Sequence, residues 1–200
     1  MIQKIDNYFK LDTRNTSYLF EINGAGIAEH LYYGPYIETR DVTFLRQKRE
    51  FEPGSTLLMQ PDYLGFSLED ALLEMSSYGK GDIREPLLEV CHADGSITSD
   101  FRFADFTIDR EKKPLETLPA SYDDLSEAEH LLVTLKDVRY DLTLEMHYYV
   151  YAADNVITRT MKLHNTSGET VKLNRLLSNQ LDLPDSGYKV INFTGAWTRE

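Results

Sequence analysis

A strict alternation of apolar and other residues runs through the stretch LTLEMHYYV, residues 142–150. Every second position carries a large apolar side chain, and this set is Leu142, Leu144, Met146, Tyr148 and Val150. Successive side chains of a β-strand point to opposite faces of the sheet, so this spacing predicts a strand with one face in a core. The chain must therefore contain a sheet that packs against something else.

Many other short segments have the character of strands and are separated by turn-forming residues. We predict further strands within Tyr8–Leu11, Ser17–Ile22, Ile27–Tyr33, Leu87–Val90, Phe101–Ile108, Leu131–Leu135, Val156–Leu163 and Val171–Leu177. Irregular spacing between Phe103 and Phe106 predicts a β-bulge near Ala104. A hairpin is expected over residues 91–97, around Asp94-Gly95. The pattern is typical of an all-β, antiparallel β-sandwich, and we expect residues 1–200 to form one domain.

One short helix is expected, between Phe66 and Met75. Ser67 and Asp70 have the spacing of a capping box, and the apolar residues that follow fall on one helical face. The next residues, Tyr78-Gly79-Lys80-Gly81-Asp82, contain two glycines and predict a tight turn that ends the helix. This turn lacks the Gly-Lys-Ser/Thr ending of a phosphate-binding loop. Asp82 or Arg84 is expected to make local hydrogen bonds there, and docking to another domain is the alternative.

Charge and composition limit the possible partners. The chain has 33 acidic and 21 basic residues, for a net charge of −12, which disfavours nucleic acids and anionic membranes. No apolar run is long enough to span a membrane, and the N-terminal residues lack the apolar core of a signal peptide, so a cytoplasmic location is expected. Cys91, the only cysteine, is expected in a buried strand.

No catalytic or metal-binding set is evident in the sequence. The acidic pairs Glu69-Asp70 and Asp123-Asp124 are best explained as solvated surface. The five histidines lack the close spacing of a zinc site, and one cysteine excludes thiolate clusters. His130 and His147 fall on the polar positions of their strands and are expected at the surface. We therefore predict no catalytic residue, no metal and no cofactor in this chain.

Several motifs in one order resemble a known family. They are FSLEDALLEMSSYGKGDIREPLLEV at residues 66–90, Asp94-Gly95-Ser96, Leu118-Pro119-Ala120-Ser121-Tyr122, Val156-Ile157-Thr158-Arg159, Leu181-Asp182-Leu183-Pro184 and Gly195-Ala196-Trp197. Together these motifs resemble the N-terminal domain of family 36 α-galactosidases. The resemblance implies a large β-sandwich, a supersandwich, that precedes a (β/α)8 barrel carrying the catalytic carboxylates. A barrel needs about 250 residues, so we expect the barrel downstream and absent from this chain.

The resemblance also implies an activity and partners. The parent protein would be a retaining α-galactosidase that removes terminal α-galactose from melibiose-type or raffinose-type oligosaccharides without a cofactor. Its partners would be these α-galactosides, the chain's own catalytic barrel and further copies in a homo-oligomer, as in tetrameric family members. Alone, the chain is expected to be inactive.

The irregular region between Thr43 and Tyr63 is expected to form an interface loop that approaches a neighbouring subunit's sugar pocket. Its substrate-contact candidates are Arg46, Lys48, Arg49 and Tyr63. Where the family has a carboxylate and an arginine, this sequence has Lys48 and Leu64, and a surface loop packed on its own domain is the alternative. The candidates for interdomain docking are Tyr78, Asp82, Arg84 and Trp197.

Two other functions stay open: a free-standing carbohydrate-binding module, and a structural sandwich that mediates assembly. A binding module should display exposed aromatic and amide side chains together. A docking domain should instead display an exposed apolar surface that a second domain covers.

Overall fold

The structure is a computed structural model that describes residues 1–38, 40–46, 66–113, 115, 120–123, 127–195 and 197–198. The elements in these ranges are ten strands and one short 3₁₀-helix. The strands are β1 (Ile2–Ile5), β2 (Tyr8–Asp12), β3 (Thr16–Ile22), β4 (Ala28–Pro35), β5 (Leu88–Cys91), β6 (Phe101–Asp109), β7 (Glu129–Asp137), β8 (Leu142–Tyr151), β9 (Val156–Asn165) and β10 (Lys172–Leu176). The 3₁₀-helix η1 covers Thr43–Leu45.

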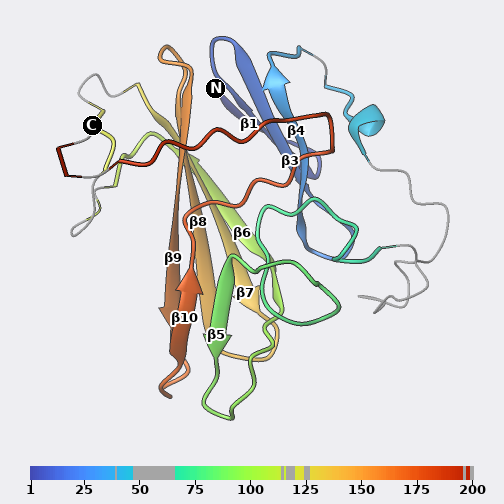
Figure 1. Cartoon of the computed structure of the whole chain (residues 1–200). Helices are drawn as coiled ribbons and strands as arrows, with labels where there is room; N and C mark the ends of the chain where they lie inside the picture. Colours follow the sequence, from blue (N-terminus) through green and yellow to red (C-terminus); the bar gives the residue numbers. More distant parts are fainter. Residues whose placement is uncertain are drawn as a thin grey trace.

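Two four-stranded antiparallel sheets form the body of the molecule (Figure 1). The first has the order β1-β2-β3-β4 and the second β6-β7-β8-β9, each an up-and-down meander. A separate two-stranded sheet pairs β5 with β10, which lie more than 80 residues apart in the sequence. The predicted antiparallel β-sandwich is thereby confirmed.

The core lies between the two large sheets and is rich in aromatic rings. Phe9 of β2 stacks on Phe20 of β3 at a centroid distance of 4.9 Å and meets Phe106 of β6 edge-on at 5.2 Å. Phe20 stacks in turn on Tyr148 of β8, also at 5.2 Å. The contacts with Phe106 and with Tyr148 join residues of one sheet to residues of the other, so the sheets pack face to face.

The alternation in β8 predicted its core face correctly. Its five alternating residues are all at most 1% exposed, and they belong to the main core cluster. The other face of β8 is also covered toward its end. There, the ammonium of Lys112 lies 4.0 Å from the centre of the Tyr149 ring, and the Tyr151 hydroxyl is 2.7 Å from the hydroxyl of Ser121. The connection between β6 and β7 therefore packs on the outer surface of this sheet.

The β-bulge is confirmed, whereas the hairpin over residues 91–97 forms only as a tight turn, which the His92 amide closes by donating to the Ser96 carbonyl at 2.8 Å. The register of β6 against β7 shifts between Phe103 and Asp105. The turn at Gly95 forms with a φ of +84°, but the chain after it does not return along β5. Residues 96–100 instead contact the earlier turn, where the Ser77 hydroxyl donates to the Ser99 carbonyl at 2.9 Å. The edge of β5 therefore stays available for pairing with β10.

The predicted helix between Phe66 and Met75 is also wrong, because the segment forms turns and isolated bridges. Its main-chain groups are paired with distant residues instead. The amide of His30 donates to the Leu72 carbonyl at 2.8 Å, and the Glu74 amide donates to the Ala28 carbonyl at 3.1 Å. The segment thus lines up along β4, and these tertiary hydrogen bonds replace the helical ones.

Two smaller differences from the predictions concern strand β1 and the burial of Cys91. β1 was not expected from the sequence, and it pairs with β2 along its whole length. Cys91 lies in β5 as expected but is only half-buried. Among the described residues, no helix is long and apolar enough to cross a membrane.

Candidate functional site

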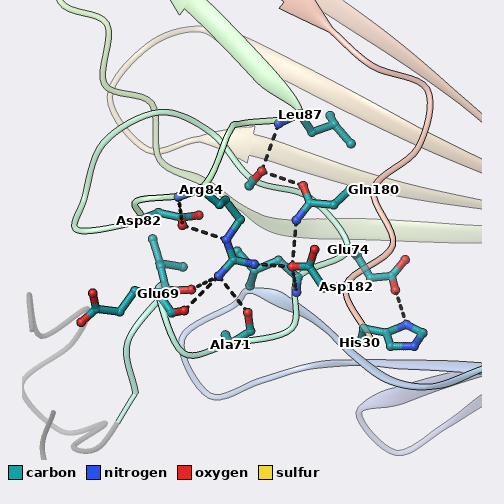
Figure 2. Close-up of polar contacts among 12 residues, drawn as sticks. His30, Glu69, Ala71, Glu74, Asp82, Arg84, Leu87, Gln180 and Asp182 are labelled. Carbon is teal, nitrogen blue, oxygen red and sulfur yellow. Dashed lines mark hydrogen bonds and ion pairs between the residues drawn. The ribbon is translucent and has the colours of Figure 1, made fainter. Parts of the chain in front are cut away.

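Two polar clusters hold the segment 66–87 against the sandwich and against the chain that follows β10. Figure 2 shows the contacts around Arg84 and the contact of His30 with Glu74. The first, here called the Glu74 cluster, consists of Tyr18, His30, Glu74, Tyr148 and Arg159. The second, the Arg84 cluster, consists of Ser76, Asp82, Arg84, Gln180 and Asp182. The Glu74 cluster joins residues from five separate parts of the sequence, and the Arg84 cluster joins the turn region to residues 180–182.

The carboxylate of Glu74 is fully buried between the two sheets. The Tyr18 hydroxyl donates to it at 2.6 Å, and the Tyr148 hydroxyl donates at 2.7 Å. His30 contacts the same carboxylate through Nδ1 at 2.9 Å. The guanidinium of Arg159 lies 3.3 Å from Oε2 of Glu74 and also donates to the Glu74 main-chain carbonyl at 2.9 Å. Four side chains from β3, β4, β8 and β9 therefore meet on one carboxylate.

Electrostatics keep this carboxylate ionised. Burial alone would raise the pKa of Glu74, but the charge of Arg159 and the hydrogen bonds from His30 and Tyr18 outweigh burial and lower that pKa below 4.5. Burial and the neighbouring carboxylate raise the pKa of Tyr18 well above 10.0. The hydroxyls thus remain protonated and serve as donors. The Glu74 side chain is only 1% exposed and is ion-paired with Arg159, which makes Glu74 unsuitable as an acid or base for an outside substrate.

The Arg84 cluster connects the turn region around Asp82 to Asp182, in the chain after β10. Nε of Arg84 donates to Asp82 at 2.8 Å, and Nη1 forms an ion pair with Asp182. The remaining nitrogen, Nη2, donates to the main-chain carbonyls of Leu68 and Ala71. Asp182 also accepts from the amide of Leu73 at 2.9 Å. One guanidinium thus supplies the donors that a helix would have supplied to these carbonyls.

Residues 177–182 complete both clusters. Gln180 accepts from the Ser76 hydroxyl at 2.6 Å and donates to Asp182 at 3.0 Å. Its main-chain carbonyl accepts from Arg159 at 2.8 Å. Figure 1 shows this stretch rising from β10 across the sandwich, before the chain turns back toward its C-terminus. The two clusters therefore fix the path along which the chain leaves the domain.

Beyond residue 183 the chain displays a row of exposed apolar side chains. These residues are Tyr188, Val190, Ile191, Phe193 and Trp197. Phe193 and Trp197 are each 93% exposed. Five exposed large apolar side chains within residues 188–197 are more than an ordinary surface segment carries, and exposed apolar surface often marks a site of contact with another domain.

Of the four sequence-predicted substrate-contact residues, only Arg46 lies within the described residues. Arg46 donates to Glu21 at 2.9 Å and to Asn7 at 3.0 Å, so its guanidinium is held on its own domain. Lys48, Arg49 and Tyr63 lie outside the described residues. Their predicted contact with substrate therefore stays a prediction.

The docking candidates are divided as well. Asp82 and Arg84 are brought together in the Arg84 cluster, and the local hydrogen bond expected between them is present. Tyr78 is half-exposed at the start of the glycine-rich turn. Trp197 lies in the exposed apolar row and is not anchored within the described part of the chain. Gly79, Lys80 and Gly81 all have positive φ, which confirms the tight turn, although no helix precedes it.

The expectation that His130 and His147 lie at the surface is wrong, since both are buried. Nδ1 of His130 contacts Asp109 at 2.9 Å, and its Nε2 contacts Nδ1 of His147 at 2.9 Å. Nε2 of His147 then contacts Glu145 at 3.3 Å. These side chains form a continuous polar chain across β6, β7 and β8, on the outer face that the β6–β7 connection covers. Among the described residues, no group of His, Cys, Asp and Glu has the arrangement of a metal site.

This histidine chain should make stability depend on pH. Burial lowers the pKa of His147 below 6.5, and protonation of both rings would place one N–H against another at the 2.9 Å contact. Below about pH 6.5 the unfolded chain then binds more protons than the folded chain, so the free energy of unfolding should fall as the pH drops. Urea midpoints measured between pH 8 and pH 5.5 should decrease, and less steeply in His147→Gln. Equal slopes for both proteins would contradict this assignment.

Comparison with known proteins identifies the fold family. Residues 26–200 match the sequence model of the glycosyl hydrolase family 36 N-terminal domain. The chain belongs to this family. The α-galactosidase AgaA of Geobacillus stearothermophilus is 36% identical over 197 residues, which cover 96% of this chain and 26% of that protein. Alpha-galactosidase Mel36A of Lactobacillus acidophilus is 32% identical, again over 96% of this chain and 26% of its own length.

Solved structures agree with this family assignment. The crystal structure of the α-galactosidase from Lactobacillus brevis superposes with a TM-score of 0.87 at 34% identity, covering 96% of this chain and 26% of that one. A variant of the Geobacillus stearothermophilus enzyme in complex with raffinose gives a TM-score of 0.82 at 33% identity, covering 88% and 24%. This family 36 N-terminal domain thus spans about a quarter of the length of the relatives it matches.

Sequence reasoning missed Glu74, the residue on which this family 36 N-terminal domain concentrates its buried hydrogen bonds. One feature of the sequence indicated that a buried hydrogen-bond acceptor is present. Tyr148 was predicted to face the core, and a buried tyrosine hydroxyl needs a hydrogen-bond partner. A buried hydroxyl needs an acceptor, but the sequence does not say which one, because the stretch from Glu69 to Glu89 contains six acidic residues, its two ends included.

Proposed function

We propose that this chain is the non-catalytic N-terminal domain of an α-galactosidase that hydrolyses terminal α-galactosides of the melibiose and raffinose type. The observation that carries the proposal is the family 36 match over residues 26–200, with relatives about four times as long. The buried, ion-paired state of Glu74 agrees with a structural role rather than a catalytic one. Catalytic carboxylates would then come from the parent's barrel.

The domain's task would be to support that barrel. The Glu74 and Arg84 clusters hold residues 177–182 rigidly, and the exposed apolar row at residues 188–197 follows directly. We propose that the chain's own catalytic barrel covers this row. A cytoplasmic location and a homo-oligomeric state, tetrameric as the resemblance implies, belong to the same proposal. So does contact of Arg46, Lys48, Arg49 and Tyr63 with a neighbouring subunit's substrate.

The isolated chain should not hydrolyse an aryl α-galactoside. An assay with p-nitrophenyl α-galactoside, after purification from a host that lacks its own α-galactosidase, should give the rate of the enzyme-free control. Activity that co-purifies with the chain through successive columns would place catalysis inside these 200 residues. That result would contradict the non-catalytic assignment.

A chimera tests the supporting role directly. In it, this chain replaces the matching part of the Geobacillus stearothermophilus enzyme. We expect the chimera to be soluble and to cleave raffinose.

Changing Val190, Ile191 and Phe193 together to serine should abolish assembly with the barrel, whereas three serines at exposed Ile83, Tyr122 and Val138 should not. Equal activity in both triple variants would refute the docking role of the row.

A further inference from the structure

A pocket of about 190 Å³ opens beside the Glu74 cluster. Tyr18 and Tyr33 contribute aromatic surface to it, and their ring centroids are 5.9 Å apart. Ile157 and Leu181 contribute aliphatic surface. Tyr18 is buried, whereas Tyr33 is 45% exposed, so aromatic surface extends from the floor of the pocket to its rim. The pocket is formed by β3, β4, β9 and the segment after β10, which both polar clusters hold in place.

Two asparagines also line the pocket and present donors rather than acceptors. Oδ1 of Asn155 accepts from the Thr13 hydroxyl at 2.6 Å and from the amide of Asn15 at 3.2 Å. Oδ1 of Asn179 accepts from Arg159 at 2.8 Å. These contacts fix the amide orientation. Within the described residues, the hydrogen bonds of both side chains go to the oxygen, which leaves each NH₂ group to donate to a ligand.

The pocket carries no net charge. Among the described residues that line it, Arg159 alone is charged, and its guanidinium is paired with Glu74 and bonded to Asn179 and Gln180. An anion would therefore find no free cation there. A neutral ligand rich in hydroxyl acceptors fits better.

The shape and the lining together indicate the ligand class. The volume corresponds to about six water molecules, which suits one sugar ring rather than an oligosaccharide. Tyrosine rings pack on the apolar face of a sugar, and amide donors bind its hydroxyls. We propose that this pocket binds a single neutral pyranose. The proposal goes beyond the supporting role argued above and does not depend on it.

Nuclear magnetic resonance on the ¹⁵N-labelled 200-residue chain tests the proposal. Titration with methyl α-D-galactopyranoside should shift the side-chain amide signals of Asn155 and Asn179 in a saturable way. Asn179→Asp keeps the acceptor for Arg159 but removes the donors, so it should weaken binding about tenfold, the loss of one good hydrogen bond. Asn192→Asp, an exposed position outside the pocket, should bind as the unchanged chain does.

Three results would overturn the proposal. The first is the absence of saturable shifts at any soluble sugar concentration while the chain is folded. The second is acetate shifting the same signals more strongly than the sugar, which would indicate an anion site. The third is unchanged affinity in Tyr33→Ala, because a pyranose that stacks on this ring must lose affinity without it. Tyr33→Phe keeps the ring and should retain most of the binding.

Discussion

Replacing Glu74 with glutamine should lower the free energy of unfolding by about 3–5 kcal/mol. The substitution keeps the size of the side chain and some of its hydrogen bonds. It removes the negative charge opposite Arg159, whose side chain is only 6% exposed. A buried cation without its partner is costly, because the protein interior does not replace the lost hydration. Chemical denaturation at neutral pH gives the measurement.

Two companion variants separate charge from packing. In Glu74→Gln/Arg159→Met neither charge remains, so a substantial part of the loss should be recovered. Glu169→Gln, an exposed position, should change stability by less than about 0.5 kcal/mol. If the double variant is as unstable as the sum of its single variants, the ion pair is not what holds this cluster together.

Leu144→Ala should cost about 2–5 kcal/mol of unfolding free energy. Leu144 is 0% exposed and lies opposite Leu135 of β7 and Leu163 of β9, so truncation leaves a cavity at the centre of the sandwich. Thr143→Ala, one residue earlier and on the opposite face of the strand, should cost far less. Similar denaturation midpoints for the two variants would mean that the register of β8 is wrong.

Local pattern predicted much of this fold because strands carry their own signature. The alternation in β8 and the short apolar runs elsewhere depend only on which face of a strand is buried. That information is present in the local sequence. The local sequence does not show which strand each strand pairs with. β5 pairs with β10 and not with its neighbour in sequence, a choice set by where residues 96–100 pack.

The errors have a common cause in distant contacts. The segment 66–75 has a helical pattern, but its main-chain groups form hydrogen bonds with Arg84, Asp182 and the edge of β4 instead of with one another. His130 and His147 occupy polar positions of their strands, and only the packing of the β6–β7 connection buries them. In the candidate site, Tyr148 was placed correctly by its spacing. The choice of Glu74 as its partner required the three-dimensional structure.

The Glu74 cluster also has a consequence for the order of folding during synthesis. The β1–β4 meander involves neighbouring strands and can pair as soon as it emerges from the ribosome. The segment around Glu74 must wait for Arg159 and Asp182, which at usual elongation rates takes on the order of 5 to 20 s. Throughout that interval the Glu74 carboxylate has no ion-pair partner. We therefore expect the sandwich to close late, after β9 and the residues that follow β10 have been synthesised.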